Sequence, residues 1–140
     1  MEVSDVRRRL RTAIEETKRR ADERRAKKDT AVREWERVLA DVAVPAFQQL
    51  ALALNAEGYR YSVTTPGTAV RLVPERGGEE FVELSLDTEG DEPVVMIRST
   101  RGRGRRTVTN ERAIGAGSSI EVLSAAEVID GVIGELKGSL

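Results

Sequence analysis

The stretch VLADVAVPAFQQLALALNAEG, residues 38–58, decides the fold of this 140-residue chain. Its apolar side chains cover more than one stripe of a helical wheel, as in a helix that is buried on most sides. Pro45 removes one backbone hydrogen bond and clashes with the preceding turn, so we expect a kink near residues 42–44. Asn55 and Gly58 favour the left-handed conformation that ends helices. The stretch therefore predicts the main core helix of a globular head.

The residues before this core helix predict a long, charged helical rod. Acidic residues precede basic residues by four positions, as in Glu16 and Arg20, and each such pair stabilises a helix by about 0.2–0.5 kcal/mol. Large apolar side chains follow a three-and-four spacing only at the two ends of the rod. The middle of this seam carries Arg24 and Lys28, which argues against a tight zipper. The candidate helix-pairing residues are Leu10, Ile14, Trp35 and Val38.

Two aromatic residues lie in the apolar register at the junction of rod and head. We expect Trp35 and Phe47 to anchor the core there, with contact to a partner helix as the alternative for both. The expected domain organisation is a rod or coiled-coil extension over residues 1–37 and a head over residues 38–140.

From Tyr59 onward, apolar and polar residues alternate, which is the pattern of half-buried strands. Turns rich in Gly and Pro divide the region into a five- to six-stranded antiparallel meander. One segment, residues 105–110, has Val108 as its only large apolar residue, so we expect it at an exposed edge of the sheet. The expected strands are residues 59–64, 69–73, 81–86, 94–99, 105–110 and a short sixth strand, 120–122.

A second helix is predicted near the C-terminus. Ser124 and Glu127 have the spacing of a capping box, and a following apolar stripe, residues 128–136, is expected to bury one side of the helix. Its glycines, Gly131 and Gly134, permit a close approach to a neighbouring element. The order of helix, meander and helix predicts the α+β class, with the helices packed on one face of the sheet.

The composition narrows the classes of function. The chain has no His and no Cys, so it lacks the usual acid-base group near neutral pH, thiolate ligands and disulfides. Adjacent carboxylates such as Glu79 and Glu80 are expected to be solvated. We therefore expect neither an enzyme nor a resident metal or cofactor. Without a signal-peptide pattern or an eighteen-residue apolar run, we expect a cytoplasmic protein, and the Arg- and Ala-rich composition suggests a bacterial one.

Two basic segments are candidate sites for phosphate or an acidic partner. Residues 18–28 hold seven Lys or Arg against two acids, and we expect them to form a solvated helix face, with phosphate contact as the alternative. The second segment is an Arg-rich turn, for which a solubilising hairpin tip is the alternative. Its candidate contact residues are Arg101, Arg103, Arg105 and Arg106. Neither segment contains aromatic residues for base stacking, and the net charge of the chain is −1.

These observations lead to two functional hypotheses. The first is a non-enzymatic interaction or assembly protein, whose rod pairs or docks and whose head binds a protein partner, with a second copy as the expected partner. The alternative is a nucleic-acid-associated protein that contacts phosphates through the Arg-rich hairpin and the basic helix.

Overall fold

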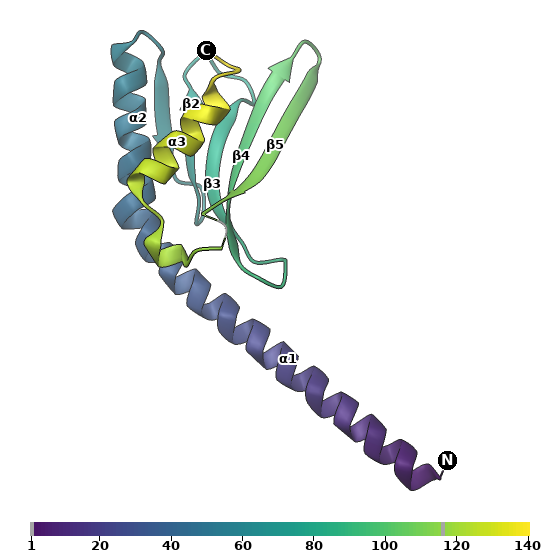
Figure 1. Cartoon of the computed structure of the whole chain (residues 1–140). Coiled ribbons are helices and arrows are strands. Elements are labelled where there is room, and N and C mark those ends of the chain that lie inside the picture. The colour runs from purple at the N-terminus through teal and green to yellow at the C-terminus, as the bar shows by residue number, and fades with distance from the viewer. Residues whose placement is uncertain (1, 116) are drawn as a thin grey trace.

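The computed structural model describes residues 2–115 and 117–140 (Figure 1). It confirms the α+β class: a long N-terminal helix leads into a head made of a five-stranded antiparallel sheet and a C-terminal helix. The helices are α1 (Val3–Val38), α2 (Val44–Ala56) and α3 (Ala125–Leu136), with a π-helical segment (Leu39–Ala43) between α1 and α2. The strands are β1 (Tyr61–Thr64), β2 (Val70–Pro74), β3 (Phe81–Asp87), β4 (Val94–Arg103) and β5 (Arg106–Ile114).

The expected irregularity before Pro45 is the π-helical segment. Pro45 has no N–H to donate to the preceding turn, and the N–H of Val44 bonds to the carbonyl of Leu39, five residues back. The chain therefore stays helical from Val3 to Ala56 with one wide turn. The helix ends where the sequence predicted: Gly58 adopts a φ of 93°, and Tyr59 N–H bonds to the carbonyl of Leu54 at 2.8 Å.

The strands pair in chain order, β1-β2-β3-β4-β5, and every neighbouring pair is antiparallel. The hairpin between β4 and β5 is longer than expected, because pairing continues to Arg103 opposite Arg106. Only Gly104 and Arg105 connect the two strands, and Gly104 has the positive φ, 61°, that such a tight turn needs.

The prediction of a sixth strand over residues 120–122 was wrong. Ile120–Val122 form one turn of 3-10 helix instead, because the Ser119 hydroxyl accepts the N–H of Glu121 and fixes a helical turn. A positive φ at Gly115 and Gly117 turns the chain away from the sheet before this point.

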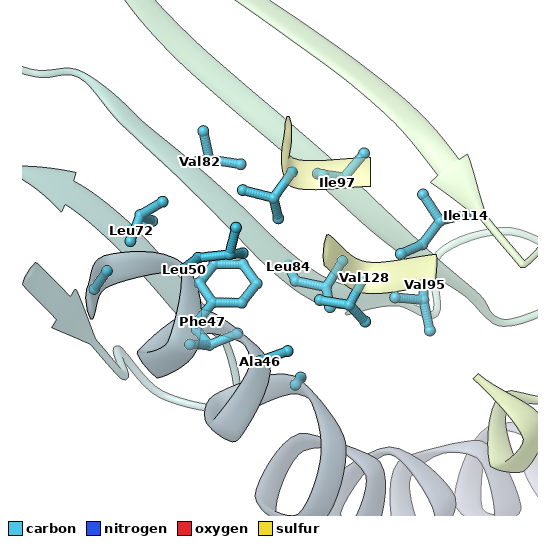
Figure 2. Close-up of a cluster of buried hydrophobic side chains, with 14 of the residues drawn as sticks. Ala46, Phe47, Leu50, Leu72, Val82, Leu84, Val95, Ile97, Ile114 and Val128 are labelled. Atoms are coloured by element: carbon cyan, nitrogen blue, oxygen red, sulfur yellow. The ribbon is translucent and has the colours of Figure 1, made fainter. Parts of the chain in front are cut away.

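The core lies between the sheet and the two head helices. Helix α2 packs on β1 and β2, and α3 crosses β3, β4 and β5 on the same face. Figure 2 shows Phe47 and Leu50 of α2 facing Leu84 and Val128, with Ile97 beyond them. We call the opposite side of the sheet the open face. Its residues alternate with the core-facing ones along each strand.

Helix α3 is fixed by polar contacts as well as by apolar packing. The predicted capping box is confirmed, since the Ser124 hydroxyl accepts the Glu127 N–H and the Glu127 carboxylate accepts the Ser124 N–H. The predicted close approach is also present: a Cβ at Gly131 would lie 3.6 Å from Ile97. Arg112 of β5 donates to the Gly131 carbonyl at 3.0 Å and to Glu135 at 2.9 Å. These bonds hold α3 against the edge of the sheet.

The last turns of α1 belong to the head. Ala31, Trp35 and Val38 are buried, and the Trp35 indole N–H donates to the carbonyl of Thr68 at 2.7 Å. Phe47 is also fully buried, so both aromatic residues are core anchors, as expected. The part of α1 that projects from the head therefore ends near Ala31, some residues before the expected boundary at residue 37.

The continuous helix from Val3 to Ala56 contains an eighteen-residue window with a mean hydropathy of 1.3, of which 39% is buried. A partly buried core helix and a membrane-spanning helix both contain such a window, so the window does not distinguish between the two.

A chain that lacks residues 1–30 should fold on its own. The buried residues of α1 begin at Ala31, so this truncation removes no core side chain. We expect the truncated chain to melt cooperatively by circular dichroism. If it is unfolded while the full chain melts cooperatively, the rod contributes to folding in a way that its exposure does not indicate.

Substitutions of Leu50 and Ile133 should differ in cost. Leu50 is buried, whereas Ile133, which the sequence placed in the buried stripe of α3, is 42% exposed. Leu50→Ala should cost about 2–5 kcal/mol and Ile133→Ala about 1 kcal/mol or less, measured by urea denaturation. Equal costs would contradict the arrangement of α3 on the sheet.

Candidate functional site

The projecting part of α1 carries an exposed apolar stripe. Val3, Val6, Leu10 and Ile14 lie on one side of the helix, and each is between 47% and 76% exposed. We call these four residues the rod stripe. Two of the expected pairing residues, Leu10 and Ile14, belong to it. The other two, Trp35 and Val38, are buried in the head, so they are not available to a partner helix.

The side chains that flank the rod stripe and its continuation are cationic on both sides. In the three-and-four spacing that runs through Leu10 and Ile14, the flanking positions hold basic residues and Ala13, while the carboxylates lie on the far side of the helix. We call these basic residues the cationic rim. They are Arg11, Lys18 and Arg25 on one side and Arg20 and Lys27 on the other.

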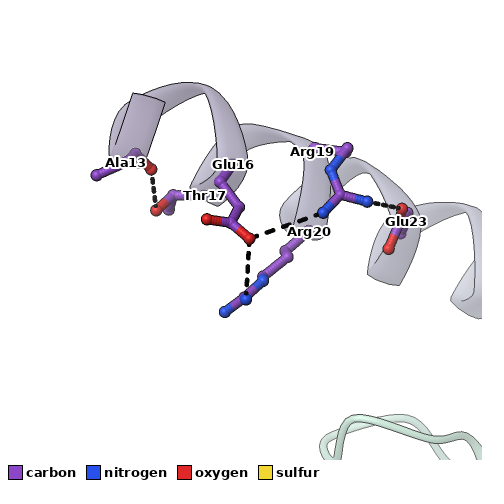
Figure 3. Close-up of polar contacts among 6 residues, drawn as sticks. All are labelled: Ala13, Glu16, Thr17, Arg19, Arg20 and Glu23. Carbon is purple, nitrogen blue, oxygen red and sulfur yellow. Dashed lines mark hydrogen bonds and ion pairs between the residues drawn. The ribbon is translucent and has the colours of Figure 1, made fainter. Parts of the chain in front are cut away.

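Ion pairs within the helix support the exposed rod (Figure 3). The Arg20 guanidinium lies 3.2 Å from the Glu16 carboxylate, as the i,i+4 spacing predicted. The Arg19 guanidinium lies 3.0 Å from the Glu23 carboxylate. The hydroxyl of Thr17 donates to the carbonyl of Ala13 at 2.8 Å. Since all these groups are exposed, each pair stabilises the helix only slightly.

The acidic loop between β3 and β4 lies against the rod. Lys27 Nζ lies 2.6 Å from the Glu92 carboxylate, and Arg24 lies 4.0 Å from Asp91. The hydrogen bond to Glu92 and the charge of that carboxylate raise the pKa of Lys27. A groove between rod and loop begins at Thr17, just beyond the rod stripe. A basic segment of the rod and the acidic loop therefore meet within one chain.

The four arginines of the Arg-rich turn do not form one cluster. Arg101 lies on β4, and a Cβ at Gly138 would overlap its guanidinium, so this side chain packs against the C-terminal segment. Arg105 is exposed at the tip of the hairpin and Arg106 is exposed at the start of β5. The side chain of Arg103 lies outside the described part of the structure.

A row of alternating charges crosses the open face of the sheet. Arg71 of β2, Glu83 of β3, Arg98 of β4 and Glu111 of β5 are cross-strand neighbours. Arg71 and Arg98 bond to Glu83 at 2.5 and 3.0 Å, and Arg98 lies 4.0 Å from Glu111. We call this row the charge ladder. Its positive groups also lie over the ring of Phe81, with the Arg71 guanidinium 4.2 Å from the ring centre.

The alternation of Glu83 with Val82 and Leu84 predicts a solvent-exposed Glu83 on β3, but its side chain is only 8% exposed. Two guanidiniums cover it, which a single strand pattern does not reveal. The missed signal is that charged residues of opposite sign are cross-strand neighbours on consecutive strands. This can be recognised only once the registers of the hairpins are known.

Among the described residues, no group of three or more Asp or Glu is arranged to hold a metal ion. Comparison of the chain with protein-family models, with curated proteins and with solved structures found no match.

Removing the centre of the charge ladder should destabilise the head. Glu83→Ala leaves two partly buried guanidiniums without their shared carboxylate, which should cost about 1–3 kcal/mol. Glu79→Ala, at an exposed position, is the matched control and should change stability by about 0.5 kcal/mol or less. Urea denaturation measures both. A Glu83→Ala variant as stable as the control would mean that the charge ladder makes no net contribution to the free energy of unfolding.

Proposed function

We propose that this protein is a non-enzymatic interaction protein that presents a helix to a protein partner. The exposed rod stripe carries the proposal. Its four apolar side chains are removed from water only if another surface covers them. A partner helix with a complementary apolar stripe would bury them. The head supplies the anchor that holds the rod, through the buried Trp35.

The cationic rim indicates what kind of helix fits. In a pair of helices, the flanking positions of one helix face those of the other, in both parallel and antiparallel arrangements. Two rods of this chain would bring like charges together, Arg20 against Arg25 in a parallel pair and the flank of Arg11 and Lys18 against itself in an antiparallel pair, which disfavours self-pairing. A partner helix with Asp or Glu beside its apolar stripe would instead be complementary. The contact between Lys27 and Glu92 is an example of the same match within the chain.

Two other anionic partners fit less well. A membrane surface or a nucleic acid that approached the stripe would also meet the acidic loop, which lies against the same rod at Arg24 and Lys27. Like charges would then oppose the contact. A narrow helix that lies along residues 3–20 reaches Arg11, Lys18 and Arg20 of the cationic rim and ends before the contacts of the loop with Arg24 and Lys27. Nucleic-acid binding through Arg105 and Arg106 remains the alternative function.

The proposal is tested with the full chain and synthetic helical probes. The first probe is a labelled peptide with a Leu and Ile stripe flanked by Glu, and the second is the same peptide with Lys in place of Glu. We expect fluorescence anisotropy to detect binding of the Glu peptide only. Leu10→Asp with Ile14→Asp should weaken it about tenfold or more, because two charged groups then enter the apolar contact. Leu52→Asp, at an exposed position of α2, is the matched control and should bind normally.

Three results would contradict the proposal. They are no binding of the Glu peptide, equal binding of both peptides, and binding that the stripe variant leaves unchanged. Retardation of duplex DNA that is lost in an Arg105→Gln, Arg106→Gln variant, but kept in the stripe variant, would favour the nucleic-acid alternative.

A further inference from the structure

The outer edge of β5 is the second surface that lacks a neighbour among the described residues. The sheet order ends at β5, so one side of this nine-residue strand has no paired strand. Every residue of β5 except Ile114 is exposed. Unpaired backbone groups along such an edge favour the addition of another strand.

The hairpin register identifies the backbone groups that point outward. Residues on either side of a two-residue turn form a hydrogen-bonded pair, and bonded and non-bonded pairs then alternate along an antiparallel ladder. Arg103 and Arg106 are that first pair. The N–H and C=O groups of Thr107, Thr109, Glu111 and Ala113 therefore point away from β4.

The usual protection of an edge strand is weak in β5. Natural edges carry Lys, Pro or inward-pointing charges that oppose strand addition, and residues 106–114 contain neither Lys nor Pro. Arg112 is drawn away onto Glu135 and the Gly131 carbonyl of α3. The charges left within β5 itself are Arg106 and Glu111, and Arg105 lies in the turn directly before it.

The charge ladder indicates which residue a neighbouring strand should supply. The ladder alternates in sign from Arg71 to Glu111 and ends at the edge of the sheet, where the Glu111 side chain is 55% exposed. A cation placed beside Glu111 on an added strand would continue the alternation. A cross-strand pair of opposite charge is favourable, and a like-charged pair is unfavourable.

We propose that the added strand is β5 of a second copy, antiparallel and related by a two-fold axis at Val108. In this register Glu111 lies opposite Arg105 of the other copy, the turn residue directly before β5, twice by symmetry, and Thr107 lies opposite Thr109. The outward backbone groups of these two threonines then face each other. Val108, which is partly exposed, meets its own copy on the axis. The two five-stranded sheets become one continuous sheet.

Three other two-fold registers, with axes at Glu111, Thr109 and Asn110, match the charges less well. An axis at Glu111 places two carboxylates opposite each other, and an axis at Thr109 places Arg106 opposite Arg112. An axis at Asn110 leaves Glu111 opposite Thr109, without a cation. Of these four registers, only the axis at Val108 gives Glu111 a cation without pairing like charges.

The proposal is tested by sedimentation velocity of the full chain at micromolar concentration, where we expect a dimer. Arg105→Glu and Glu111→Arg should each weaken dimerisation about tenfold, since each change replaces two attractive pairs with two repulsive ones. The double variant restores opposite charges in exchanged positions and should recover most of the affinity. Thr109→Pro removes an outward N–H and should give a monomer, with circular dichroism confirming that each variant is folded.

The rod variant Leu10→Asp, Ile14→Asp is the control that separates this interface from the proposed helix docking. It should leave the dimer unchanged. A monomeric wild-type chain, a dimer unaffected by Thr109→Pro, or a double variant no better than the single ones would overturn the edge interface. A dimer lost in the rod variant would instead place self-association on the rod.

Discussion

Burial of Trp35 is the interaction on which the arrangement of rod and head depends. The helix α1 contains 36 residues and is therefore about 54 Å long, but its buried residues lie within its last two turns. The indole fills the junction and its N–H is satisfied by Thr68. The second contact, between Lys27 and Glu92, joins exposed groups and is weakened by salt. Trp35 therefore fixes the direction of the rod, and the loop pair only adjusts it.

Local sequence signals predicted most of the fold. The apolar helix, its stop at Gly58, the irregularity before Pro45 and the capping box at Ser124 each depend on residues a few positions apart, so a single sequence contains them. The errors arose where pairing or a local cap outweighed propensity. Arg101–Arg103 continue β4 because β5 pairs with them, and the β-branched Ile120 and Val122 form a 3-10 turn because Ser119 caps it.

The candidate surfaces were less predictable because they depend on contacts between distant residues. Leu10 and Ile14 were found from their spacing alone. In contrast, the cover over Glu83 and the contact of the acidic loop with the rod join residues that are up to 65 positions apart in the chain. The Arg-rich turn shows the opposite error. Residues close in sequence lie in different surroundings there, since Arg101 packs on the C-terminal segment while Arg105 is exposed at the tip of the hairpin.

The π-helical segment sets the side on which the rod presents its apolar residues. A π turn holds one residue more than an α turn, so it rotates the preceding helix by about 100° about its axis. Loss of one residue from Leu39–Ala43 would turn the indole of Trp35 away from Thr68 and carry Arg24 and Lys27 away from the acidic loop. The direction in which the rod stripe points is therefore set outside the rod, by the one additional residue of the π turn next to Pro45. Two chains with identical rods but different lengths of this segment would offer different sides of the same helix to a partner.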